Sequence, residues 1–239
     1  MYDKFIYMEQ DRIKEIDRIL VGFTDGLNVK EWHVPNCIDK ETLIKMRYFE
    51  TMPQYLTTAE SYMNNEEKLF LKPAACLPIY PQIKRYNIVN EIITTMTNVY
   101  RYDNFDGKNH FWEFTVREFV LVGTEDYVMV TLEKILEKTI VFLLNRNLKT
   151  ITQVSSDHFY SSAKNRMLGR FQKANRLKRE IICKCKNEDI ILGSVNYHGI
   201  HFSKMFGFDD NEKIVTGCIG FGIERWYRLW NMIESEKKL

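Results

Sequence analysis

The amino-acid sequence predicts an α+β protein built on a largely antiparallel β-sheet. Strand-like segments outnumber helical ones and follow one another, whereas a parallel sheet would alternate strands with helices. Two of these segments flank a seven-residue loop with Gly107 in its middle, which predicts a hairpin. No Pro- or Gly-rich linker divides the chain, so we expect residues 1–239 to form a single domain.

The helices and strands follow from residue spacing. Residues 1–25 carry apolar side chains at helical intervals, including Ile13, Ile16 and Leu20. Thr124 can cap a second helix over residues 124–146, since acidic residues occupy its first turn. A third helix is predicted over residues 223–238. Strands are predicted over residues 68–73, 98–103, 111–122, 150–156, 179–185, 189–198 and 213–221.

Composition and charge narrow the class of protein. Of the residues, 45% are hydrophobic and 28% charged, which is typical of a soluble globular protein. A net charge of +2 is too small to indicate nucleic-acid binding by itself. No apolar run approaches the ~20 residues of a membrane span, and charges interrupt the N-terminal segment. We therefore expect a cytoplasmic protein whose five cysteines are thiols or metal ligands.

One predicted strand carries an unexpected carboxylate. In residues 111–122 the even positions form an apolar stripe with Glu118 in its middle. A buried, unpaired carboxylate is costly, so Glu118 needs a metal or a cationic partner. An arginine such as Arg117 is the alternative partner, although strict alternation places it on the opposite face. The other members of the stripe are Trp112, Phe114, Val116, Val120 and Val122.

Two further segments suggest nucleotide chemistry. In the hairpin, Arg101 and Asp103 share a face, and His110 and Phe114 follow the loop. An arginine can bind a phosphate, an acid can accept from a base amino group, and a ring can stack on the base. The alternative is a surface hairpin with an ion pair. A second segment, "TGCIGFGIERW", places Gly217, Gly220 and Gly222 before Arg225; such glycines either admit a ligand or let a helix pack closely.

Together these segments resemble motifs 2 and 3 of the class II aminoacyl-tRNA synthetases. Motif 2 corresponds to Arg101, Asp103, His110 and Phe114, and motif 3 to "GFGIER". "LKPAACLPIYPQI", "FTVREFVLVGTEDYV" and "SVNYHGIHF" narrow the resemblance to the amino acid:[carrier protein] ligases, which have a seryl-tRNA-synthetase-like catalytic core. "IKMRYFETMPQYL" then corresponds to a degenerate motif 1 with Pro53. The resemblance implies a mostly antiparallel sheet flanked by helices.

The resemblance also implies roles for individual residues. Cys76, Glu118 and Cys218 would bind a catalytic Zn²⁺. Arg101 would bind the α-phosphate of ATP and the substrate carboxylate, and Arg225 and His110 the γ-phosphate. Asp103 would meet the adenine amino group and Phe114 would stack on the ring. Glu212 would bind Mg²⁺, or else be a solvated loop residue.

The implied reaction is the ATP-dependent activation of a small amino acid as an aminoacyl-adenylate. The acyl group would pass to the phosphopantetheine thiol of a carrier protein, because we expect no tRNA-binding domain in this chain. A basic stretch over residues 164–179 either docks an acidic carrier or is a solvated helix or phosphate-side loop. Motif 1 implies a homodimer. The alternatives are a ligase with another acceptor (tRNA, a protein lysine or a small amine) and an inactive regulator.

Overall fold

The structure is a computed structural model that describes residues 7–60, 68–101, 110–155, 178–186, 188–208 and 213–236. Asp103, Glu212 and residues 164–177 of the basic stretch lie outside the described residues. The proposed adenine contact, the Mg²⁺ ligand and the carrier-docking stretch therefore stay predictions.

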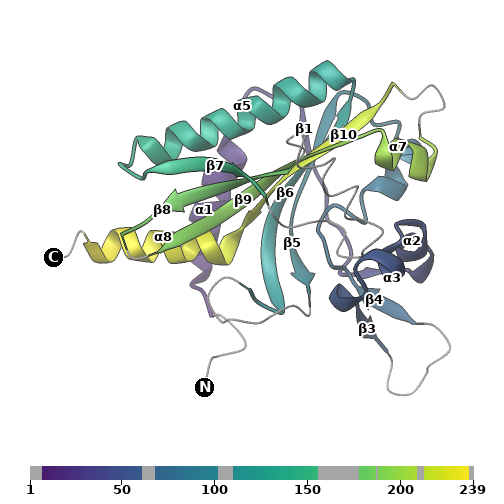
Figure 1. Ribbon diagram of the computed structural model, residues 1–239, viewed down its shortest axis with the longest axis horizontal. Coiled ribbons are helices and arrows are strands. Elements are labelled where there is room, and N and C mark those ends of the chain that lie inside the picture. The colour runs from purple at the N-terminus through teal and green to yellow at the C-terminus, as the bar shows by residue number, and fades with distance from the viewer. Residues whose placement is uncertain are drawn as a thin grey trace.

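A seven-stranded sheet forms the centre of the molecule (Figure 1), in the order β1-β5-β6-β10-β9-β8-β7. Every neighbouring pair is antiparallel except β1 and β5, which run parallel. The largely antiparallel prediction is confirmed. The strands are β1 (Val29–Glu31), β5 (Glu91–Tyr100), β6 (Glu113–Gly123), β7 (Thr150–Val154), β8 (Lys178–Lys184), β9 (Asp189–Gly199) and β10 (Val215–Gly222).

The three predicted helices form one layer against this sheet. They are α1 (Gln10–Gly22), α5 (Glu125–Leu144) and α8 (Ile223–Glu236). Thr124 caps α5 as predicted, because its side chain accepts a hydrogen bond from the Tyr127 amide at 3.4 Å. The Phe23 ring lies 5.4 Å from Phe142 of α5 and 6.1 Å from Trp226 of α8, so it joins the three helices in one core.

The opposite face of the sheet packs against a smaller group of elements, of which β3, β4, α2 and α3 lie at the lower right of Figure 1 and α7 lies above them. A second sheet, ordered β2-β4-β3, contributes Phe70 to this second core, where Val120 and Val122 of β6 also lie. Short helices connect β2 to β3, β4 to β5 and β9 to β10. The elements are β2 (Cys37–Ile38), α2 (Lys40–Lys45), α3 (Tyr48–Thr51), η1 (Pro53–Tyr55), β3 (Thr57–Ala59), β4 (Leu69–Leu71), η2 (Tyr80–Gln82), α4 (Ile83–Tyr86) and α7 (His201–Phe206).

The predicted apolar stripe needs two corrections. Trp112 precedes β6 and is 40% exposed, so it is not a member of the buried stripe. From Val116 onward the odd positions are buried as well, including Arg117 and Phe119, because β6 is a central strand covered on both faces. Arg101 follows the end of β5 and does not lie within the strand.

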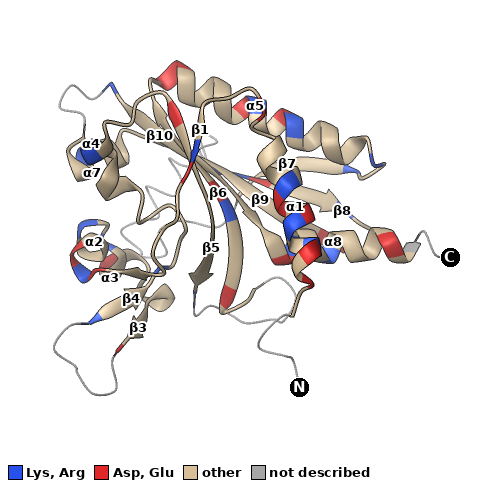
Figure 2. Ribbon diagram, turned by 180° about the vertical axis from the view of Figure 1, so that it is seen from behind, with Lys and Arg blue, Asp and Glu red and all other residues tan. Residues whose placement is uncertain are grey.

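The segment with Pro53 folds as α2, α3 and η1. The homodimer expected from motif 1 stays a prediction. Figure 2 shows charged residues on α1, α5 and α8, whereas the strands are mostly uncharged. No helix in the described part of the chain is long and apolar enough to cross a membrane.

Candidate active site

Three predicted metal ligands from distant parts of the chain meet on one face of the sheet. Cys76 follows β4, whereas Glu118 and Cys218 lie in β6 and β10. Their ligand atoms lie within 4.8 Å of one another. Glu118 and Cys218 are 7% and 3% exposed, and Cys76 is 9% exposed. The register that pairs Cys218 with Val120 places Glu118 and Cys218 on the same face.

Two glycines of β10 make room on opposite sides of the strand. A Cβ atom at Gly220 would lie 2.4 Å from the Glu118 carboxylate oxygen, so the absence of a side chain admits the carboxylate. A Cβ atom at Gly217 would lie 2.9 Å from Leu132 of α5. Both alternatives considered for the glycine-rich segment therefore occur. Gly217 permits close helix packing, and Gly220 gives space to a candidate ligand.

The chemistry of the cluster fits a zinc ion. Burial raises the pKa of Glu118 to about 7, while a hydrogen bond with Cys218 and the charge of Arg101 act in the opposite direction. A hydrogen bond with Cys76, together with burial, raises the pKa of the Cys218 thiol. A bound metal ion would stabilise the ionised ligands. Two thiolates and one carboxylate suit zinc, and three protein ligands leave it one open position.

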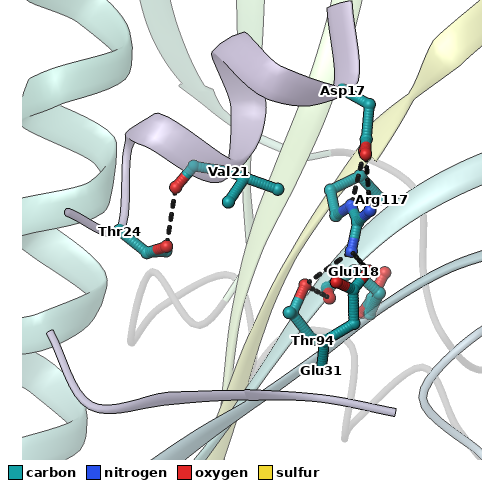
Figure 3. A network of polar contacts seen from close by, with 7 residues as sticks. All are labelled: Asp17, Val21, Thr24, Glu31, Thr94, Arg117 and Glu118. Atoms are coloured by element: carbon teal, nitrogen blue, oxygen red, sulfur yellow. Dashed lines mark hydrogen bonds and ion pairs between the residues drawn. The ribbon is translucent and has the colours of Figure 1, made fainter. Parts of the chain in front are cut away.

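Arg117 is not the partner of Glu118. Its guanidinium points to the helical side of the sheet, where Nε and Nη2 donate to the two Asp17 carboxylate oxygens at 2.6 and 2.7 Å (Figure 3). Nη1 donates to Glu31 at 2.7 Å. Thr94, beside this network, donates to the backbone carbonyl of Glu118 at 2.9 Å. The ion-pair alternative for Glu118 is therefore wrong as far as Arg117 is concerned.

Two side chains of β9 contact the sulfur of Cys218. Asn196 Nδ2 lies 3.4 Å and His198 Nε2 3.7 Å from Cys218 Sγ. The other ring nitrogen of His198 lies 3.2 Å from Thr216 Oγ1 and 3.4 Å from the Tyr80 hydroxyl. Burial lowers the pKa of His198 to about 3, so the imidazole is neutral at physiological pH.

The predicted nucleotide residues Arg101 and Phe114 lie beside the cluster. Arg101 Nε donates to the Pro73 carbonyl at 2.6 Å, which holds it against the segment that carries Cys76. Its guanidinium carbon lies 5.5 Å from the centre of the Phe114 ring and 5.7 Å from that of Tyr55. The same charge acts on Glu118. Arg101 therefore lies against the ring that is predicted to stack on adenine, and its charge acts on one of the three predicted metal ligands.

Arg225 and His110 lie at the ends of other elements. Arg225 is in the first turn of α8, and its Nη1 donates to the Ile191 carbonyl of β9 at 3.1 Å. The preceding residue, Glu224, is buried and accepts a hydrogen bond from the Thr115 amide of β6 at 2.8 Å. His110 is exposed before β6. The γ-phosphate contacts of Arg225 and His110 stay predictions.

Asn196 is a site residue that sequence reasoning missed. Alternation in β9 places residues 194, 196 and 198 on one face, which is a usable signal. The pairing of Asn196 with Cys218 across the strands is not visible in the sequence, because it depends on the register of β9 against β10.

The chain is similar in sequence to two groups of known proteins. No protein-family model matches the chain. The chain is 27% identical over 164 residues to amino acid–[acyl-carrier-protein] ligase 1 of Bradyrhizobium diazoefficiens, covering 66% of this chain and 50% of that protein. It is 25% identical over 247 residues to the type-2 serine–tRNA ligase of Methanococcus aeolicus, covering 86% and 46%. The chain thus spans about half the length of these relatives.

A solved structure has the same fold. The M. kandleri SerRS, in complex with A. aeolicus tRNASec, matches with a TM-score of 0.69 and 21% identity, over 90% of this chain and 51% of that one. The chain is therefore a homologue of the amino acid–[acyl-carrier-protein] ligases and type-2 seryl-tRNA synthetases, with the fold of a class II aminoacyl-tRNA synthetase catalytic core.

Proposed function

We propose that the protein is a ligase that activates an amino acid with ATP and transfers it to the phosphopantetheine thiol of a carrier protein. The observation that carries this proposal is the cluster of Cys76, Glu118 and Cys218 within 4.8 Å, beside Arg101 and Phe114. A metal site for the substrate amine next to a cation and an aromatic ring suits the formation of an aminoacyl-adenylate.

The proposed first step joins the amino acid to AMP. A carboxylate oxygen of the amino acid bonds to the α-phosphorus of ATP as the bond to the pyrophosphate oxygen breaks. Arg101 binds the reacting carboxylate and α-phosphate, and Arg225 and His110 bind the γ-phosphate, so that positive charge meets the departing pyrophosphate. Phe114 stacks on the adenine, while Asp103 and Glu212 keep their predicted contacts to adenine and Mg²⁺.

Cys76, Glu118 and Cys218 would hold Zn²⁺ in this proposal. Bound by these residues, zinc supplies one open coordination position, which a neutral α-amine can take. A small substrate side chain is what the resemblance to the carrier-protein ligases implies.

The second step transfers the acyl group. The carrier thiol attacks the adenylate carbonyl, loses its proton and releases AMP. The similarity to amino acid–[acyl-carrier-protein] ligases supports this acceptor. A tRNA acceptor is the second candidate, because the alignment with the type-2 serine–tRNA ligase covers more of the chain, 86% against 66%.

The test of adenylation is amino-acid-dependent exchange of labelled pyrophosphate into ATP, without carrier or tRNA. We expect exchange with one or a few small amino acids, lost in Cys76→Ser. Cys185→Ser is the matched control, since this half-buried cysteine lies beside Cys183, with the two sulfurs 3.9 Å apart, in a different part of the sheet. Folded, zinc-loaded protein that supports no exchange would overturn the proposal and favour an inactive regulator.

The acceptor needs a separate measurement. Transfer of labelled amino acid to carrier protein with the phosphopantetheine arm, and not to the same carrier without it, is the expected result. Labelling of tRNA alone would establish the second candidate.

A further inference from the structure

We propose that Asn196 and His198 are positioning residues that hold the Cys218 thiolate by two neutral hydrogen bonds when the metal is bound. This inference rests on the proposed zinc site. It extends that site by two side chains to which the sequence analysis gave no role.

The two contacts converge on one sulfur. Asn196 is directly opposite Cys218 in the register of β9 and β10, and its Nδ2 lies 3.4 Å from the sulfur. His198 Nε2 lies 3.7 Å from the same atom. A metal-bound thiolate is only an acceptor, so both nitrogens must carry the hydrogen.

The surroundings of His198 suit that tautomer. Its Nδ1 faces two hydroxyl groups, Thr216 Oγ1 at 3.2 Å and Tyr80 at 3.4 Å. Either hydroxyl can donate to Nδ1, which leaves the ring hydrogen on Nε2, where it faces the sulfur. At metal sites, a hydrogen bond to one ring nitrogen of a histidine commonly fixes which of the two nitrogens carries the hydrogen.

Alternation along β9 puts Asn196 and His198 on the same face, and both side chains reach Cys218 Sγ. A bulge follows at this point, because Thr216 pairs with Gly199 and its neighbour Gly217 pairs with Tyr197, which leaves His198 as the extra residue. Such a bulge lets β9 stay paired with β10 beyond His198.

Asn196 reaches Cys218 through its amide nitrogen. The side chain is 5% exposed, and its Oδ1 has no hydrogen-bond partner among the described residues. The Nδ2 group, in contrast, lies near both Cys218 and Ser194.

Charge gives the physical reason for these donors. Two thiolates and a carboxylate around Zn²⁺ carry a net charge of −1 in a buried site. Neutral N–H groups stabilise the excess negative charge on sulfur without adding a cation that would repel the metal.

The test compares two replacements of His198. The glutamine amide nitrogen extends about as far as Nε2, whereas asparagine reaches only to the position of Nδ1. We expect His198→Asn to weaken metal binding by about 10- to 100-fold in chelator competition, and His198→Gln to restore most of the loss. The thiolate-to-metal charge-transfer band of the Co²⁺-substituted protein should shift in His198→Asn and return in His198→Gln.

Asn196→Leu provides an independent test that leaves His198 in place, and we expect the same loss of affinity and the same kind of spectral shift. Metal binding and spectra equal to the unmodified protein in both His198→Asn and Asn196→Leu would overturn the inference alone. A lack of any thiolate band in the unmodified, folded protein would instead overturn the proposed zinc site on which the inference rests.

Discussion

Arg117 and Glu118 are neighbours in β6, and both are buried ionisable side chains, yet the groups that surround them differ. Arg117 is 2% exposed and makes close hydrogen bonds to carboxylates of Asp17 and Glu31, on the side of the sheet that faces the helices. Glu118, on the other side, has two thiols as its near neighbours and a pKa raised to about 7. A charge matched by opposite charges supports the fold, whereas a buried carboxylate among thiols points to a ligand that the chain does not itself supply.

Replacing Glu118 should have the largest effect on function and none on the fold. We expect Glu118→Gln to weaken metal binding by about 10³-fold, since a neutral amide is a much poorer zinc ligand. The free energy of unfolding of the metal-free variant should be equal to or above that of the unmodified protein, because an amide is easier to bury than a carboxylate. Metal titration and urea unfolding measure the two quantities.

Tight zinc binding by Glu118→Gln would mean that the Glu118 carboxylate is not a ligand of the proposed site. Urea unfolding at a much lower concentration would make Glu118 a structural residue like its neighbour, and the contrast between the two charges would disappear.

Arg117 should show the opposite pattern. We expect Arg117→Met to lower the free energy of unfolding by about 3 kcal/mol, because Asp17 loses its bidentate partner and α1 loses a polar link to β6. Asp17 and Glu31 are 20% and 64% exposed, so water can solvate them and limit the loss. Zinc affinity of the folded variant should stay within about threefold of the original.

The matched control is Arg117→Lys, which keeps the charge but not the planar fork, and it should recover part of the stability. Should Arg117→Met lose zinc while remaining equally stable, the assignment of the two faces would be reversed.

Gly220 and Gly217 extend the comparison to the next strand. Gly220→Ala places a methyl group against the Glu118 carboxylate, which is a flexible side-chain end and can move aside. We therefore expect about tenfold weaker zinc binding and only a small change in stability.

In Gly217→Ala the new methyl group would lie 2.9 Å from Leu132 of α5 and 3.0 Å from the backbone oxygen of Asn196, so the free energy of unfolding should fall by about 1–3 kcal/mol. Thermal unfolding with and without zinc separates these effects, and equal zinc affinity in Gly220→Ala would contradict the first.

The sequence predicted the fold well where periodicity is strong. The long helices and the strands β4 and β6 to β10 appear at the expected segments, because apolar spacing records which face is buried. The strand predicted over residues 98–103 overlaps β5 (Glu91–Tyr100) only at its end, so most of β5 was missed. It did not reveal β1, β2 and β3, since two or three residues carry no period and pair only through tertiary contacts. Alternation identified Glu118 as anomalous, but Cys76 and Cys218 were joined to it only by family resemblance. The sequence spacing of these residues carries no metal signature.

Lys72 is a third buried charge, intermediate between the other two, and no sequence pattern indicated its burial. It is fully buried, and its ammonium donates to the Pro35 carbonyl at 2.8 Å and to Asn36 Oδ1 and Thr97 Oγ1, both at 2.7 Å. All three acceptors are neutral, so burial lowers the pKa of Lys72 to about 8 in the folded protein. The ordinary value of 10.5 applies when the chain unfolds.

Between about pH 8 and 10.5 the unfolded chain therefore binds more protons at Lys72 than the folded protein does. The free energy of unfolding should rise with pH in this range, by on the order of 1–2 kcal/mol, against the general decline caused by other groups. Lys72→Met removes this rise, and the difference between the two urea-unfolding profiles isolates it. A pH-independent difference would mean that the three neutral oxygens solvate the ammonium as well as water does. Lys72 would then be matched as fully as Arg117, and Glu118 would stand alone among the three as a charge that needs an external partner.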